Sequence, residues 1–209
     1  MSGNKQRHGE SDAGERAGAG KLPPRVFGGF HRHRCPHRGR RRAKHAFTER
    51  QYAYARIQGD GQVYTPQVVV NGSEHANGAN RRAIDASAET TTPPQLAVSV
   101  KRSGDEIEVT VGATGSGSPR ATVVLLPYLG SRQVAIGRGE NARRKVAYTN
   151  IVRDIIPVGE WSGAAASFKA KLPHGENYDG VVVLVQEGTP ANPGAILGTA
   201  LLPLHGPRA

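Results

Sequence analysis

Short apolar runs separated by turn residues fill the C-terminal half of the chain, and this pattern restricts the fold more than any other feature. Eight or nine such runs follow one another between residues 95 and 204. Residues 106–111 alternate, so that Ile107, Val109 and Val111 face one side of a strand. Residues 181–185 are apolar without alternation, which is typical of a central strand buried on both faces. The pattern predicts an antiparallel, immunoglobulin-like β-sandwich over residues 95–204.

The expected strands cover residues 96–100, 106–111, 121–128, 133–136, 145–148, 151–156, 166–172, 180–186 and 195–202. Gly130 and Ser131 are expected to form a hairpin turn, because glycine and serine both favour turns. Trp161 is expected at a strand corner, where its large side chain anchors the core.

Residues 46–94 form a shorter segment in which helix and strand signals alternate. Residues 46–56 have the apolar spacing of a helix, and residues 63–70 form a β-rich run. Asn71-Gly72 closes that run and is the strongest two-residue signal for a hairpin. A second helix is expected over residues 80–88, followed by a linker that ends at Pro94.

Several blocks of sequence resemble the bacterial secreted family known as domain of unknown function 1223. They are residues 46–51, 63–72, 135–142, 148–153, 159–161, 183–186 and 194–198, so the resemblance covers residues 46–202. It implies that residues 46–94 are part of a thioredoxin-like domain. It also implies that Tyr64, Thr65, Pro66 and Gln67 form the cis-proline loop of that domain.

The chain departs from the family at the point where redox chemistry would arise. In thioredoxin-like folds the cis-proline loop faces a C-x-x-C pair, but this sequence has a single cysteine, Cys35. The expected fold class is therefore α+β and mostly β: an incomplete thioredoxin-like fragment followed by an immunoglobulin-like sandwich.

Residues 1–45 carry most of the positive charge. They hold 12 Lys and Arg against 3 Asp and Glu, a net +9 of the total +11, which leaves +2 for residues 46–209. Leu22 and Val26 are their only Leu, Ile or Val residues, so this basic tail is expected to be disordered. Its Arg, Gly, Ala, Pro and His content is what GC-rich codons give when translated out of frame.

Two other interpretations of the basic tail remain open. Residues 32–44 could bind nucleic acid or anionic lipid through phosphate contacts, although no Phe, Tyr or Trp lies among them to stack on bases. The second alternative is a metal site, since His31, His33, Cys35 and His37 would share one face of an extended strand. Their spacing departs from the usual zinc patterns, and no cofactor is expected.

One loop of the expected sandwich gathers charged and amide side chains that suit an anionic ligand or a protein partner. These are Arg138, Glu140, Asn141, Arg143, Arg144 and Lys145. His75, His174 and His205 are expected in separate loops, and the sequence contains no G-x-S-x-G, H-E-x-x-H or P-loop motif.

The sequence therefore predicts a non-enzymatic interaction or scaffold protein with an unknown protein partner. One alternative is the thiol-disulfide oxidoreductase implied for the full-length family, inactive here for lack of the C-x-x-C pair; the other is nucleic-acid binding by the basic tail. The exposed strand edge at residues 63–70 predicts self-association. The family is expected to be periplasmic or secreted, whereas this chain, without an apolar signal stretch or membrane span, is expected in the cytoplasm if expressed as written.

Overall fold

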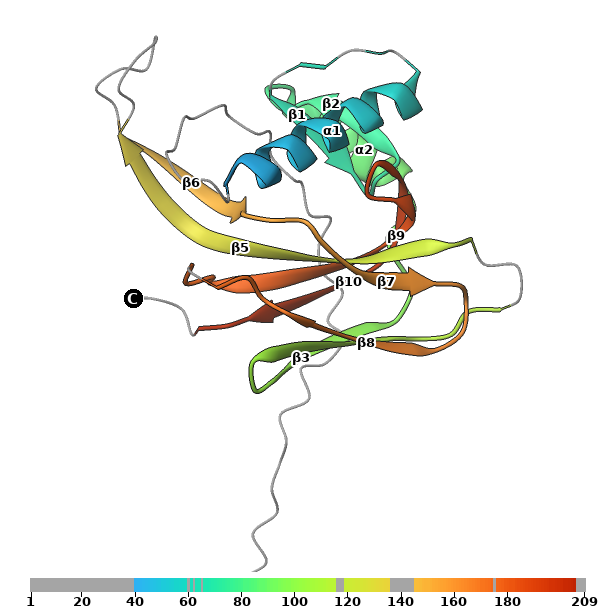
Figure 1. Ribbon diagram of the computed structural model, residues 1–209. Helices are drawn as coiled ribbons and strands as arrows, with labels where there is room; N and C mark the ends of the chain where they lie inside the picture. Colours follow the sequence, from blue (N-terminus) through green and yellow to red (C-terminus); the bar gives the residue numbers. More distant parts are fainter. Residues whose placement is uncertain are drawn as a thin grey trace, which may run out of the picture.

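A computed structural model of the chain describes residues 40–205, apart from residues 60, 62, 65, 116–118, 136–144 and 175. Side chains are described from residue 45 on, except that of residue 58. This part of the chain is mostly β, with two helices and antiparallel sheets (Figure 1). None of its helices is long and apolar enough to cross a membrane.

An N-terminal segment of two helices and one hairpin precedes the larger sheets. Its elements are α1 (Arg40–Gln58), β1 (Gln67–Val70), β2 (Glu74–Asn77) and α2 (Arg81–Thr90). The helix α1 starts earlier than expected, and β1 occupies only the second half of the expected strand. The expected succession of helix, strand and helix over residues 46–94 is otherwise confirmed.

The turn between β1 and β2 has the expected hairpin conformation. Asn71 and Gly72 have φ values of 48° and 79°, the left-handed region that Asn-Gly turns supply. A capping interaction then starts α2, because the side chain of Asn80 accepts a hydrogen bond of 3.1 Å from the Ala83 amide.

Two antiparallel sheets make up the rest of the described chain. The smaller has the order β3-β4-β8, formed by β3 (Val98–Ser103), β4 (Glu106–Val111) and β8 (Ala166–Lys171). The larger has the order β10-β9-β5-β6, with β7 also paired to β5. Its strands are β5 (Ala121–Ala135), β6 (Lys145–Val152), β7 (Ile156–Trp161), β9 (Gly180–Thr189) and β10 (Asn192–Pro203).

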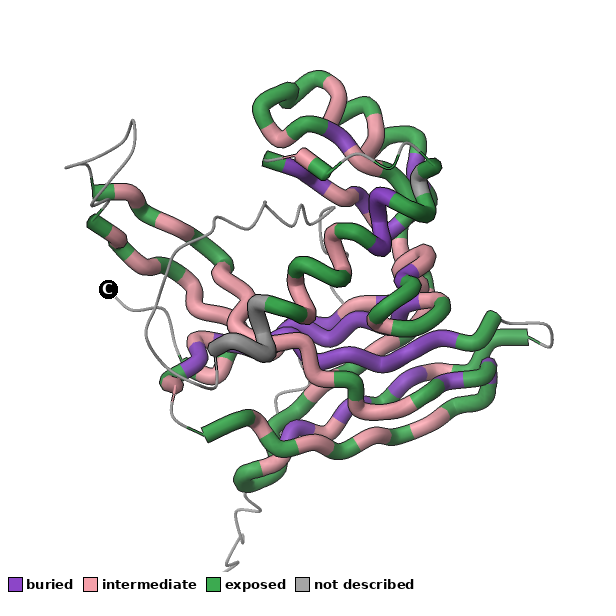
Figure 2. Tube along the Cα trace, turned by 45° about the horizontal axis from the view of Figure 1, so that its top comes forward, coloured by how far each residue is buried: buried purple, intermediate pink, exposed green. Residues whose placement is uncertain are grey.

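The main core lies between these two sheets. Ile107, Val109 and Val111 of β4 point into it, as the alternation of that strand predicts, and they belong to one cluster with Val123 and Leu125 of β5. Trp161 is 1% exposed and joins the same cluster, in agreement with its expected role as an anchor. Figure 2 shows this buried layer as the purple stretches of the stacked strands.

The strand β9 is the most deeply buried element. It runs between β10 and β5, and every residue from 181 to 186 is buried. Val181, Val183 and Val185 face the main core, while Val182 and Leu184 form a second cluster on the opposite face of the sheet. The prediction of a central strand buried on both faces is confirmed.

The expected hairpin turn at Gly130 and Ser131 is wrong. β5 continues through both residues to Ala135, and Ser131 pairs with Thr149 of β6. The Gly130 amide donates a 2.8 Å hydrogen bond to Asp179 Oδ2, a partner 49 residues away, which favours the extended conformation. The second half of β5 pairs with β6 along the whole of β6, and the two form a two-stranded ribbon (Figure 1).

The expected strand over residues 151–156 is also wrong, since it spans the end of β6 and the start of β7. Arg153 lies between these strands, and its amide donates a 2.8 Å hydrogen bond to the Pro127 carbonyl of β5. This contact changes the direction of the chain, so that β7 pairs with the first half of β5 while β6 pairs with the second half.

Candidate functional site

A small polar cluster lies beside β1. The Tyr64 hydroxyl lies 3.3 Å from His75 Nδ1, and Gln67 Nε2 lies 3.3 Å from the same nitrogen. Gln51 of α1 donates a 3.3 Å hydrogen bond to the Tyr64 carbonyl. His75, expected in a loop, therefore lies on β2 in contact with two residues of the expected cis-proline loop.

The rest of that expected loop is described only in part. Thr65 lies outside the described residues, so the cis form of the peptide bond between Thr65 and Pro66 stays a prediction. Pro66 is exposed, and its carbonyl accepts a 2.9 Å hydrogen bond from the Gly78 amide. A Cβ atom at Gly78 would lie 2.9 Å from Pro66 Cβ, so the two backbones approach closely because residue 78 is glycine.

The backbone of β1 presents one open edge. In the described part of the chain β1 pairs only with β2. Since Pro66 and Gly78 are joined by a ladder hydrogen bond, the alternation of an antiparallel pair directs the N–H and C=O groups of Val68 and Val70 toward β2. Those of Gln67 and Val69 therefore point away from β2, along the open edge.

The open edge ends at Asn71. Its carbonyl accepts a 2.8 Å hydrogen bond from the Ile196 amide of β10. Asn71 is also held from the other side, where its side-chain amide donates to Thr91 Oγ1 at 3.0 Å. The Asn71 carbonyl thus already binds a strand, whereas the outward groups of Gln67 and Val69 bind none in the described chain.

A buried glutamine joins the N-terminal segment to the larger sheet. Gln186 of β9 is 2% exposed, and its Nε2 donates to the Tyr54 hydroxyl at 2.8 Å and to the Gly194 carbonyl at 2.7 Å. The turn of the hairpin packs against the same place, because a Cβ atom at Gly72 would lie 3.0 Å from Gln186 Nε2. Helix, hairpin and sheet therefore meet at one side chain.

Arg50 completes this junction. Its Nη2 donates to the Tyr54 hydroxyl at 3.1 Å and to Gln186 Oε1, and its guanidinium carbon lies 5.3 Å from the centre of the Tyr54 ring. Its Nη1 is buried and has no hydrogen-bond partner in the described structure. Among the described residues, Arg50 contacts the neutral side chains of Tyr54 and Gln186, so it links α1 to β9.

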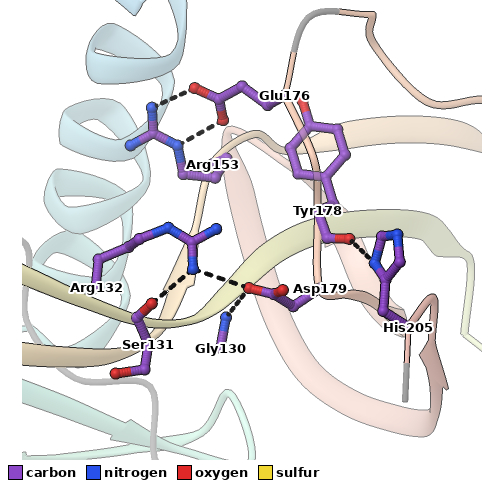
Figure 3. A network of polar contacts seen from close by, with 8 residues as sticks. All are labelled: Gly130, Ser131, Arg132, Arg153, Glu176, Tyr178, Asp179 and His205. Atoms are coloured by element: carbon purple, nitrogen blue, oxygen red, sulfur yellow. Dashed lines mark hydrogen bonds and ion pairs between the residues drawn. The ribbon is translucent and has the colours of Figure 1, made fainter. Parts of the chain in front are cut away.

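A second polar network holds the base of the ribbon formed by β5 and β6 (Figure 3). Arg153 donates two hydrogen bonds to the Glu176 carboxylate, at 2.8 Å and 2.7 Å. Asp179 Oδ2 accepts from Arg132 Nη1 at 3.1 Å as well as from the Gly130 amide. Both carboxylates belong to the connection that leads into β9, so this connection is fixed to the ribbon at two points.

Tyr178 lies between the two ion pairs and is buried. Burial, together with the negative charges of Glu176 and Asp154, raises the pKa of the Tyr178 phenol above its ordinary value. Its carbonyl lies 3.0 Å from His205 Nδ1, which ties the end of β10 to the same network. A phenol in this state stays protonated and neutral, so it has the character of a core group.

The other predicted site residues are not brought together by the described structure. Arg138, Glu140, Asn141, Arg143 and Arg144 lie outside the described residues, and Lys145 is an exposed residue at the start of β6. His31, His33, Cys35 and His37 lie outside them as well. Within the described residues, no three His, Cys, Asp or Glu side chains are grouped so as to hold a metal ion.

The polar residues at the junction and at the base of the ribbon have no motif in the sequence. Arg50 and Gln186 are 136 positions apart, and Arg153 and Glu176 are 23 apart, with no motif linking either pair. Gln186 carried one signal, since it is a polar residue that directly follows the apolar run of a central strand. A glutamine in that position needs hydrogen-bond partners once it is buried.

Comparison with known proteins assigns the chain to a family. No curated protein sequence matches it. A crystal structure of a protein from Agrobacterium tumefaciens is 30% identical to the chain with a TM-score of 0.61, covering 78% of this chain and 72% of the other. The family model described as "Protein of unknown function (DUF1223)" matches residues 41–186, which run from the second residue of α1 through the β1–β2 hairpin to Gln186 of β9. The chain therefore belongs to the DUF1223 family.

Proposed function

We propose that the chain is a non-enzymatic interaction protein that binds an extended segment of another polypeptide along the open edge of β1. In this proposal, part of a thioredoxin-like unit is mounted on an immunoglobulin-like sandwich, and the former carries the binding surface. The open edge is the observation that carries the proposal. Strand addition uses main-chain hydrogen bonds for affinity and neighbouring side chains for specificity.

Three properties of β1 support binding by strand addition. The outward N–H and C=O groups of Gln67 and Val69 are the hydrogen-bonding groups that an added strand requires. Residues 67–70 are uncharged, whereas edge strands that avoid pairing usually carry a charge, a proline or a bulge. Val68 and Val70 are 4% and 2% exposed, so the strand is held in place by its own packing before a partner arrives.

The proposal is tested by removing one outward amide. Val69→Pro deletes an N–H that takes no part in the pairing with β2, and proline is tolerated on the open side of an edge strand. The matched control is Arg102→Pro on β3, whose N–H also points away from its single neighbour β4. Extended peptides selected on the full chain from a random library should lose binding to Val69→Pro and keep binding to Arg102→Pro. Equal binding to both variants would refute the proposal.

The alternative of a thiol-disulfide oxidoreductase makes a different prediction. The single cysteine, Cys35, cannot supply a C-x-x-C pair within this chain. We expect the chain and its Cys35→Ser variant to leave the rate of insulin reduction by dithiothreitol unchanged. An acceleration that disappears in Cys35→Ser would favour the oxidoreductase. Nucleic-acid binding by residues 1–45 stays a prediction, since they lie almost wholly outside the described residues.

A further inference from the structure

We infer that the strand which occupies the open edge is β1 of a second copy of this chain, paired antiparallel about a two-fold axis at Val68. This inference rests on the proposed function, because it names the partner for the same edge. It adds a specific register. With Val68 opposite Val68 of the second copy, Gln67 lies opposite Val69 of the second copy, and the reverse pair follows by symmetry.

This register satisfies the groups that the edge leaves open. Gln67 and Val69 are the two residues whose N–H and C=O groups point outward, and here each forms a hydrogen-bonded pair with the other across the axis. Val68 then forms the non-hydrogen-bonded pair between them. Beyond Val70 the pairing stops, since the Asn71 carbonyl is already bound to the Ile196 amide. The edge is thus complementary to itself in length and in hydrogen-bond pattern.

The side chains around the edge favour a second copy over a charged partner. No charged residue lies within residues 67–70, so two copies bring no like charges together across the axis. Among the described residues, the large apolar side chains that are exposed are Tyr52, Ile57 and Val63. All of them lie on α1 or between α1 and β1, in the segment that carries the edge.

Pairing also addresses a weakness of the N-terminal segment. Within the described chain its sheet consists of β1 and β2, and a sheet of two strands depends on packing against other elements for its stability. Joining two hairpins edge to edge makes one continuous sheet that runs through both copies. A closed two-fold pair of this kind also leaves no further β1 edge open, so association through β1 ends at the dimer.

Disulfide trapping tests the register directly. In the Cys35→Ser background, Val68→Cys places two thiols on the axis, where a non-hydrogen-bonded pair brings the Cα atoms to about 4.5 Å, a separation that a disulfide spans. The matched control is Val70→Cys, on the same strand and the same face. The Cα atoms of residue 70 in the two copies would lie about 13 Å apart in this register, beyond the reach of a disulfide. Mild oxidation should yield a covalent dimer of the first variant and not of the second.

Two further measurements separate the inference from the proposed function. The unmodified full chain should show a concentration-dependent dimer by light scattering, and the amides of Gln67 and Val69 should exchange more slowly as the concentration rises. A chain that stays monomeric, with equal trapping of both cysteine variants, refutes the second copy. If selected peptides still require the Val69 amide in that case, the proposed function stands. If peptide binding does not require the Val69 amide either, both the second copy and the proposed function are refuted.

Discussion

Gln186 shows how much of the arrangement depends on a single side chain. Its amide group contacts Tyr54 of α1, Arg50 of α1 and the Gly194 carbonyl of β10, and it is almost completely buried. In the interior a polar group must find partners, and here those partners come from separate elements. The identity of residue 186 therefore fixes where α1 sits on the sheet.

Replacing Gln186 should destabilise the protein markedly. Gln186→Ala leaves the Gly194 carbonyl and the Arg50 guanidinium without this partner inside the protein, and such a loss costs about 1–3 kcal/mol of unfolding free energy. Urea unfolding measures this loss of unfolding free energy. Gln133→Ala on the exposed part of β5 is the control and should change the unfolding free energy little. Equal stability of the two variants would contradict the role given to Gln186.

Tyr178 should make the stability depend on pH at the alkaline end. Its pKa is raised in the folded state, mainly by burial, so the phenol ionises more readily in the unfolded chain. The contribution is complete below the ordinary tyrosine pKa of about 10 and is lost as the pH rises through the folded-state pKa. Tyr178→Phe should therefore lose less stability than the parent between neutral and alkaline pH. Parallel losses in urea unfolding would show that Tyr178 does not cause the dependence.

At the scale of elements, β9 and β5 differ in whether neighbouring or distant residues determine their course. The unbroken apolar run of β9 results from burial on both faces, so its place at the centre could be predicted. The course of β5 through Gly130 and Ser131 depends on Asp179 and on the partner strand β6, which lie far along the chain. Turn propensity is local information, and it gave a turn where long-range pairing produces a strand.

The same distinction explains what could be predicted of the candidate site. The Asn71-Gly72 turn and the strand before it follow from neighbouring residues, so the hairpin was found. The open edge was expected from a missing neighbour, but its end at Ile196 was not, since that contact joins residues more than a hundred positions apart. Arg50 and Gln186 carry no motif, and only the folded chain brings them together.

The ion pair at the base of the ribbon should be stronger than an exposed pair in the same molecule. Arg153 and Glu176 form a two-point contact with side chains 27% exposed each, whereas Arg81 and Asp85 on α2 are 92% and 61% exposed. A double-mutant cycle with Arg153→Met and Glu176→Gln should give a coupling of about 1 kcal/mol. The matched cycle at Arg81 and Asp85 should give about 0.3 kcal/mol. Similar couplings at both places would contradict the structural role of the partly buried pair of Arg153 and Glu176.

The whole molecule is divided unequally between its parts. The sandwich has two sheets and a continuous core, whereas the N-terminal segment has one two-stranded sheet and few buried side chains. The segment is attached through the junction at Gln186 and through Asn71. Its stability therefore depends on the sandwich more than the stability of the sandwich depends on it.

Amide exchange of the dilute full chain should reveal this inequality. The strands of the sandwich should exchange slowest, and residues 46–94 should exchange faster, because opening the N-terminal segment exposes less apolar surface. Hydrogen exchange read by mass spectrometry resolves the two regions. Equally strong protection of residues 63–70 and of β9 at low concentration would show that the segment does not open separately.

The position of Trp161 has a practical consequence for such work. The chain has one tryptophan, and its side chain is enclosed in the core between the two sheets. Intrinsic fluorescence excited at the indole band therefore comes from the sandwich alone. Opening of α1 and the β1–β2 hairpin leaves this emission unchanged. An unfolding curve recorded by tryptophan fluorescence therefore describes the sandwich and does not report on the part of the molecule that carries the open edge.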